Sequence, residues 1–291
     1  MNTIFRRNKW GENGMKAVFA GCAALCIVCL ALVCGFLFSS AIPAISKIGW
    51  SEFLFSTKWA PAQNQFGILS MIAGTLYMSL GAMVLGVPMG VLCAVFLAYF
   101  CPKKLYGPMK YAISLLAGIP SIVYGFFGLT VLVPLIQKVS GSPSGKGLLC
   151  ASLLLAMMIL PTIVSLSESA LKKVDPAVYD GSRALGASHE RTVFFVCVPA
   201  AASGIVSAVV LGVGRAIGET MAVIMVAGNA AILPANILEP VRTLTTGIVL
   251  EMSYASGLHR EALIAMGAVL FTLILLINLI FLTLKNRRKN A

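Results

Sequence analysis

The stretch from Ile68 to Phe100, ILSMIAGTLYMSLGAMVLGVPMGVLCAVFLAYF, contains no charged residue. A hydrocarbon core about 30 Å thick is crossed by a helix of about 20 apolar residues. This stretch is therefore long enough to span a bilayer, either tilted or bent at Pro88. Only helices and closed barrels satisfy backbone groups in lipid, and no segment shows the alternating pattern of a barrel strand. The sequence predicts an all-α integral membrane protein.

Five further stretches reach the length of a membrane span. With the first, they predict six transmembrane helices. The overall composition agrees, because 59% of the 291 residues are hydrophobic and 11% are charged, against a usual charged share of about 25%. That balance excludes a soluble enzyme and a nucleic-acid binder as leading classes. The five further stretches are Lys16–Phe38, Tyr111–Ile136, Gly147–Ser167, Thr192–Gly228 and Ala262–Leu284.

The distribution of positive charge predicts the orientation of the chain. Of the 22 Lys and Arg residues, fifteen fall in the two tails and in the loops after the second and fourth spans. Six fall in the three opposite loops, and Arg215 alone lies inside a span. Because cytoplasmic loops carry the excess of Lys and Arg, we expect both termini to be cytoplasmic. The first apolar stretch is longer than a usual signal-peptide core, so we expect an uncleaved first span.

No metal or cofactor site is expected in this chain. The eight cysteines form no CxxC pair and have no zinc-site spacing with histidine, so we read them as small apolar residues. The segment Gly141–Gly147 resembles a phosphate-binding loop only superficially. It has three residues between its first two glycines instead of four, and glycine replaces the hydroxyl residue after Lys146.

The loop at residues 168–199 is the longest on the cytoplasmic side and reads ESALKKVDPAVYDGSRALGASHERTVFFVCVP. Asp175 followed by Pro176 is a helix-start signal. We expect a short helix from Pro176 to about Leu185, a break at Gly186, and a second short helix capped by Ser188. An ordinary amphipathic connector would give the same pattern.

This loop resembles the EAA loop found in the permease subunits of ABC importers. The matching residues are Asp180, Gly181 and Ser182, then Gly186 after three variable residues, and a hydrophobic stretch that ends at Pro199. The resemblance implies the type I importer permease fold. It also implies that this elbow couples the chain to a separate ATPase subunit, which binds ATP and Mg²⁺, so that the chain itself is not an enzyme.

Span five contains an arginine and a glutamate one helical turn apart, in GVGRAIGET at residues 212–220. An arginine inside the bilayer costs about 2.5–3.5 kcal/mol on insertion scales, so Arg215 has to face the bundle interior or a water-filled path. Glu219 lies on the same helical face, and we expect the two to pair. A structural salt bridge and an anion site or gate are both consistent with this pattern.

The segment GRAIGETMAV at residues 214–223 resembles the signature of permeases of the phosphate-specific ABC importer, in particular the PstC type. LAGIPSIVYG at residues 116–125 resembles the same family. The likeness implies a substrate pathway or gate that includes Arg215, Glu219, Thr220 and Ser121. It also implies phosphate as the substrate, with molybdate or sulfate permeases as the near alternative and an ion-gradient-driven transporter as a distant one.

The same resemblance implies partners, a location and a division of the chain. The partners are a PstA-type permease, a PstB-type ATPase dimer and an extracytoplasmic phosphate-binding protein, with the chain in the bacterial inner membrane as a multi-pass protein in contact with lipid. No nucleic-acid partner is expected. We expect residues 1–65 to form a cytoplasmic tail, the first span and an outer loop. Residues 66–284 are expected to form the permease core, and residues 285–291 a basic cytoplasmic tail.

Overall fold

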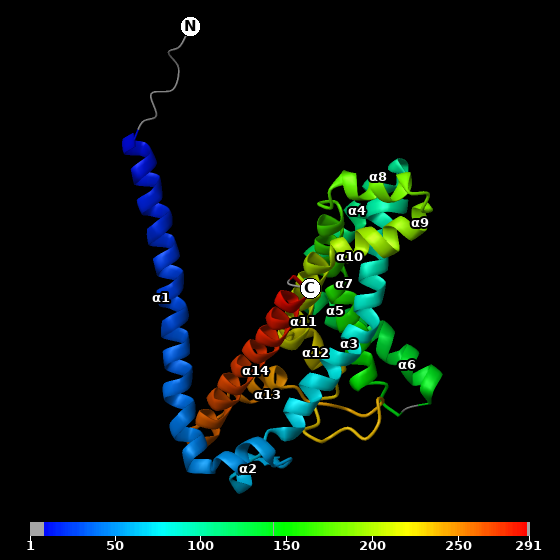
Figure 1. Ribbon diagram of the computed structural model, residues 1–291. Coiled ribbons are helices and arrows are strands. Elements are labelled where there is room, and N and C mark those ends of the chain that lie inside the picture. The colour runs from blue at the N-terminus through cyan, green and yellow to red at the C-terminus, as the bar shows by residue number, and fades with distance from the viewer. Residues whose placement is uncertain (1–8, 142, 290–291) are drawn as a thin grey trace.

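The computed structural model describes residues 9–141 and 143–289, and it is helical almost throughout (Figure 1). The helices are α1 (Lys9–Ile48), α2 (Trp50–Phe55), α3 (Leu69–Val95), α4 (Lys103–Gly118), α5 (Ser121–Phe127), α6 (Val133–Ser140), α7 (Leu148–Leu171), α8 (Pro176–Ala184), α9 (His189–Thr192), α10 (Val198–Ala200), α11 (Ala202–Gly218), α12 (Met221–Val226), α13 (Leu244–Glu251) and α14 (Gly257–Lys289). Three π-helical segments, η2 (Phe96–Phe100), η3 (Gly128–Leu132) and η4 (Val193–Cys197), and a 3₁₀ turn, η1 (Pro61–Gln63), interrupt or join them. The strands β1 (Trp59–Ala60) and β2 (Gln65–Phe66) pair antiparallel in a small hairpin.

The number of predicted spans is confirmed when one bent pair of helices is counted as a single span. Within the described ranges, five segments are long and apolar enough to cross a membrane, and the bent pair makes a sixth. The division at residues 65 and 284 stays a prediction, and the tail residues 1–8 and 290–291 lie outside the described part. The six segments are Gly14–Ile48, Leu69–Phe100, Ser121–Ser140, Leu148–Leu171, His189–Ala200 with Ala202–Gly218, and Gly257–Phe281.

The predicted third span, Tyr111–Ile136, is wrong in its first half. Helix α4 ends at Gly118 and a new helix begins at Ser121, so the membrane span is Ser121–Ser140. The cause is Pro120, which disfavours the helical conformation of the residue before it. Ile119 is accordingly extended, with φ −70° and ψ 125°.

The predicted fifth span, Thr192–Gly228, is not a continuous helix. The segments on either side of Ala201 meet at a bend of 68°. The chain leaves the helical conformation again after Gly218, and α12 begins only at Met221. Helix α11 is therefore the second half of a bent span, and Arg215 lies in its last turn.

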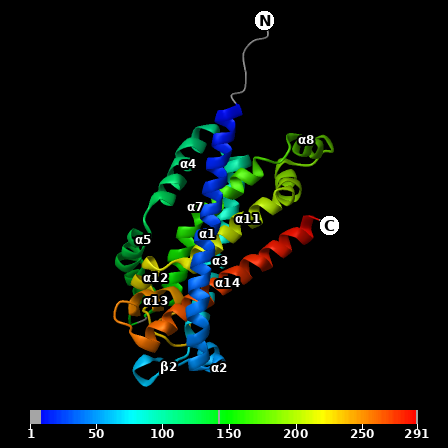
Figure 2. The ribbon, with the colours of Figure 1, turned by 90° about the vertical axis from the view of Figure 1, so that its left-hand side faces the viewer.

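Helix α1 packs against the rest of the chain over its last third only. Ala41, Ala44 and Ile45 are buried, and Phe38 makes an edge contact with Phe271 of α14. Before that point the helix diverges from the bundle (Figure 1), and in the view turned by 90° it passes in front of the bundle (Figure 2). The apolar side chains of this part of α1 are exposed. The start of α1 and helix α8 lie toward one end of the molecule, and α2 lies at the other (Figure 1). This arrangement agrees with the orientation expected from the charges.

The centre of the bundle is the contact between α3 and α7. Glycines on α3 allow it, as the Gly86/Gly90 spacing predicts. A Cβ atom at Gly86 would lie 2.9 Å from Cδ1 of Ile159, and one at Gly90 would lie 2.8 Å from Cγ2 of Ile163. At the second pair with this spacing, Gly214 and Gly218, an added Cβ would meet nothing within 4 Å, so no other described segment of the chain packs closely there.

A buried carboxylate joins helices at the cytoplasmic end of the bundle. Glu168 on α7 is 2% exposed and pairs with Lys110 of α4 and with Lys172, at 2.8 Å. The hydroxyl of Tyr106 on α4 donates to the same carboxylate at 2.6 Å. Burial by itself would lower the pKa of Lys172, but its bonds to Glu168 and Tyr106 outweigh this and raise the pKa. This cluster fixes α4 and the end of α7 to each other.

A second buried carboxylate joins segments at the outer end. The carboxylate of Glu251 on α13 accepts hydrogen bonds from Nε1 of Trp59 at 2.9 Å and from Nη1 of Arg242 at 2.6 Å. Nε2 of His259 lies 2.8 Å from the same group. Because these residues come from the hairpin, the loop before α13 and the start of α14, the cluster fixes the outer loops to the bundle.

The α3–α7 contact gives a prediction about stability. We expect Gly90→Val to lower the melting temperature of the purified protein by several degrees, because overpacking a tight contact costs about 1–3 kcal/mol. Gly21→Val on α1 is the matched control, since a Cβ there meets nothing within 4 Å. Equal melting temperatures for the two variants would contradict the close α3–α7 contact.

Candidate functional site

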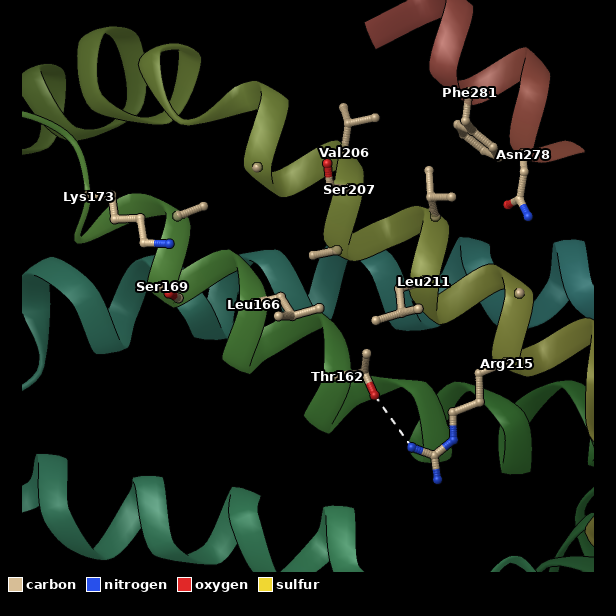
Figure 3. A pocket seen from close by; sticks show the side chains of 15 residues that line it. Thr162, Leu166, Ser169, Lys173, Val206, Ser207, Leu211, Arg215, Asn278 and Phe281 are labelled. Carbon is tan, nitrogen blue, oxygen red and sulfur yellow. Dashed lines mark hydrogen bonds between the residues drawn. The ribbon is translucent and has the colours of Figure 1, made fainter. Parts of the chain in front are cut away.

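An open groove of about 820 Å³ runs along the bundle between α7, α11 and α14. Most of its lining is apolar, but six lining residues carry a polar or charged group. They are Thr162, Ser169 and Lys173 from α7 and the residues just after it, Ser207 and Arg215 from α11, and Asn278 from α14. Figure 3 shows these side chains around the groove, with Arg215 toward one end and Lys173 toward the other.

Arg215 enters this groove from the last turn of α11. It lies thirteen residues after Ala202, which places it about 20 Å along the helix. Its guanidinium Nη1 donates to Oγ1 of Thr162 at 3.5 Å (Figure 3). Within the part of the chain that the structure describes, no carboxylate pairs with it. The guanidinium is thus an intramembrane cation with one weak neutral partner.

The expected pair between Arg215 and Glu219 is wrong in this structure. Helix α11 ends at Gly218, and Glu219 is extended, with φ −69° and ψ 135°. The spacing of one helical turn therefore no longer brings the two side chains together. Instead, Oε1 of Glu219 accepts the backbone N–H groups of Thr220 at 3.1 Å and Ala222 at 3.2 Å. The carboxylate satisfies the free N–H groups at the start of α12, where negative charge is favourable.

The two hydroxyl residues of the predicted pathway also lie at helix breaks and do not line the groove. Ser121 is the first residue of α5, directly after Pro120. Thr220 donates through Oγ1 to the carbonyl of Gly218 at 3.2 Å. The break at Glu219 is fixed from outside as well, because Oγ1 of Thr245 donates to its carbonyl at 3.0 Å. Of the predicted pathway residues, Arg215 is the one that reaches the groove.

The predicted elbow between the fourth and fifth spans is confirmed as a backbone structure. Asp175 caps α8 by accepting the N–H of Ala177 at 2.9 Å, and Ser188 caps α9 by accepting the N–H of Arg191 at 3.3 Å. Between the two helices, Gly186 has φ +89°, a conformation that side chains strongly disfavour. The elbow is therefore a fixed turn and not a loose connector.

Side-chain contacts brace the elbow from inside. The hydroxyls of Ser182 and Thr192 lie 2.9 Å apart, and that of Tyr179 lies 2.8 Å from Nδ1 of His189. Arg183 donates to the carbonyl of Ala187 at 2.6 Å. Asp180, Gly181 and Gly186 are exposed, and Ser182 is half-buried. The predicted coupling residues thus form one braced surface turn, while their role stays a prediction.

Sequence reasoning missed the groove residues on α7. Thr162 and Ser169 are seven residues apart, which places them on one face of α7, and Lys173 follows in the turn after the helix. That spacing was available in the sequence as a signal. What could not be read there is which face of α7 is left uncovered by α3 and α11.

Six spans, a braced cytoplasmic elbow and an intramembrane cation in a groove define a membrane transport subunit. Comparison with known proteins shows the family. Residues 86–290 match the binding-protein-dependent transport system inner membrane component family, and the chain belongs to it.

Relatives and solved structures agree with this assignment. The chain is 37% identical to the probable ABC transporter permease protein YqgH of Bacillus subtilis, covering 94% of this chain and 91% of that protein. It is 35% identical to the phosphate transport system permease protein PstC of Haemophilus influenzae, covering 96% of each. A chain of a bacterial alginate ABC transporter superposes with a TM-score of 0.67 at 15% identity, covering 97% of this chain and 98% of that one. A chain of the MetNI methionine ABC transporter superposes with a TM-score of 0.56 at 22% identity, covering 76% and 94%. The last two likenesses confirm the type I permease fold.

Proposed function

We propose that this chain is a permease subunit of an ATP-driven importer of inorganic phosphate. The observation that carries the proposal is the guanidinium of Arg215, which lies within a membrane span and has no carboxylate partner among residues 9–141 and 143–289. A cation in that position is stabilised by water or by an anion that passes. Arginine also presents a planar fork of donors that matches a tetrahedral oxyanion.

The similarity to named phosphate permeases favours phosphate over other oxyanions as the substrate. Several proteins named phosphate transport system permease protein PstC are about 35% identical to this chain over most of its length. Molybdate and sulfate permeases share the elbow, so the elbow does not distinguish between these substrates. An ion-gradient-driven transporter is not supported, because the family match is to a binding-protein-dependent system.

The proposal includes four kinds of partner. A PstA-type permease would complete the pathway opposite the groove, and an extracytoplasmic phosphate-binding protein would deliver the anion. A PstB-type ATPase dimer would bind ATP and Mg²⁺ and hydrolyse the nucleotide. The elbow formed by α8, Gly186 and α9 would dock on one ATPase subunit. Its apolar tip, Leu185, is 91% exposed, as expected for a side chain that enters a cleft on a partner.

Substitution of Arg215 tests the anion-pathway role. We expect Arg215→Gln to reduce phosphate uptake at least tenfold, since a charge-assisted hydrogen bond is worth about 1.5–3 kcal/mol. The amount of assembled complex should not change, because Arg215 pairs with no carboxylate in the part of the chain that the structure describes. Arg215→Lys should retain part of the uptake, because it keeps the positive charge. It should not retain all of it, because an ammonium group cannot form the bidentate hydrogen bonds of a guanidinium. Uptake into vesicles and the yield of complex are measured together.

Two further variants complete this test. Arg260→Gln removes an exposed arginine at the start of α14 and should leave uptake unchanged. The double variant Arg215→Gln with Glu219→Gln should assemble and still not transport. Wild-type uptake by the double variant would show that Arg215 serves a salt bridge with Glu219, and the proposed pathway would be rejected.

Substitution of Gly186 tests the coupling role of the elbow. We expect Gly186→Val to abolish uptake and weaken ATPase binding, because a branched residue at φ +89° costs at least about 1–2 kcal/mol and distorts the turn. Gly186→Asn should retain part of the activity, since Asn tolerates positive φ. Gly107→Val on α4 is the control, because a Cβ there meets nothing within 4 Å and the position lies outside the elbow. Full uptake and normal ATPase co-purification by Gly186→Val would contradict the coupling assignment.

A further inference from the structure

The groove that contains Arg215 has a second cation at its other end. Its lining includes the side chains of Arg215 and Lys173 and, within the described ranges, no aspartate or glutamate. A cleft lined by one sign of charge with apolar walls concentrates ions of the opposite sign. The inference below rests on the proposed function of this groove as an anion pathway.

Three polar groups of the groove come from α7 and the turn that follows it. Thr162 and Ser169 lie on α7 and Lys173 lies two residues after its end, and the three follow one another along the groove in Figure 3. The distance along α7 from Thr162, which contacts Arg215, to the end of the helix at Leu171 is about 14 Å, and Lys173 lies two residues further on. Ser169 lies one turn before Lys173. Hydroxyl groups that can donate to an anion therefore accompany both cations.

Lys173 differs from the neighbouring lysine in what its amino group contacts. Lys172 is bound to Glu168 at 2.8 Å and to the hydroxyl of Tyr106 at 2.7 Å, so it holds α7 to α4. Consecutive residues at a helix end point in different directions, and Lys173 lies on the groove side. Its Nζ makes no ion pair and no side-chain hydrogen bond with any residue that the structure describes. A structural role is thus filled by Lys172, while Lys173 is free for a ligand.

We propose that Lys173 is a second contact of the transported oxyanion, at the cytoplasmic end of the pathway that begins at Arg215. The anion leaves the guanidinium of Arg215 and the hydroxyl of Thr162, and it binds next to the hydroxyl of Ser169 and the ammonium of Lys173. Two weak sites in series allow an anion to enter and leave faster than one strong site would. Lysine suits the release end, because its ammonium is a single strongly hydrated charge and not a fork.

The position of Lys173 also joins the pathway to the elbow. It lies two residues before Asp175, which caps α8. A displacement of α8 therefore reaches this side chain through two residues of backbone. This places the release contact at the point where the elbow meets the groove.

The experiment measures phosphate uptake by the complete importer in proteoliposomes, normalised to assembled complex. We expect Lys173→Gln to lower uptake about tenfold, the size of one charge-assisted hydrogen bond, with an unchanged yield of complex. Lys173→Arg should retain most uptake. Lys104→Gln is the matched control, because Lys104 is an exposed lysine at the same end of the molecule and does not line the groove.

A charge transplant separates a pathway role from a structural one. In the Lys173→Gln background, Ser169→Lys returns a cation to the same face of the groove one turn earlier, and we expect it to restore part of the uptake. A merely structural lysine at position 173 would not be replaced in this way. Normal uptake by Lys173→Gln, or a loss of assembly that Ser169→Lys leaves unrepaired, would overturn the proposal.

The experiment distinguishes rejection of the role of Lys173 from rejection of phosphate import as the function of the chain. If Arg215→Gln abolishes phosphate uptake while Lys173→Gln leaves it unchanged, Arg215 remains the anion contact and only the role of Lys173 is rejected. If the wild-type importer does not take up phosphate, the substrate assignment itself fails.

Discussion

The structure depends on one constraint, which is a guanidinium inside a membrane span that pairs with no carboxylate among the described residues. Placing an arginine at that depth costs about 2.5–3.5 kcal/mol on insertion scales. The chain offsets this cost with a groove that remains open along α7 and α11 and with the hydroxyl of Thr162 at 3.5 Å. The carboxylate of Glu219, the nearest acidic residue in sequence, instead accepts backbone N–H groups at the start of α12. In our proposal, the positive charge of Arg215 therefore serves a mobile anion.

Helix α7 connects this cation to the cytoplasmic surface. One face packs on the glycines of α3, and another lines the groove. At its end, Glu168 is tied to α4, and the chain then continues directly into the capped elbow of α8 and α9. Because these contacts are buried or braced by hydrogen bonds, we expect a displacement of the elbow to move the packed helices with it.

The sequence allowed the spans and the elbow to be predicted because both are governed by local signals. Apolar length marks the spans, and Asp175, Gly186 and Ser188 mark the elbow through capping and positive φ. The prediction that Arg215 pairs with Glu219 was wrong because it assumed a continuous helix, whereas α11 ends one residue before Glu219. The groove could not be predicted at all, since it depends on which face of α7 its neighbours leave open. Division of the chain into domains and nucleotide binding by a partner stay predictions.

The most direct measurement is electron cryomicroscopy of the complete importer with phosphate, arrested before nucleotide hydrolysis. Our account predicts density for a tetrahedral anion within hydrogen-bond distance of the guanidinium of Arg215, with Glu219 still turned toward the start of α12. A structure in which Arg215 and Glu219 form a closed ion pair, with no anion in the groove of any trapped state, would contradict it.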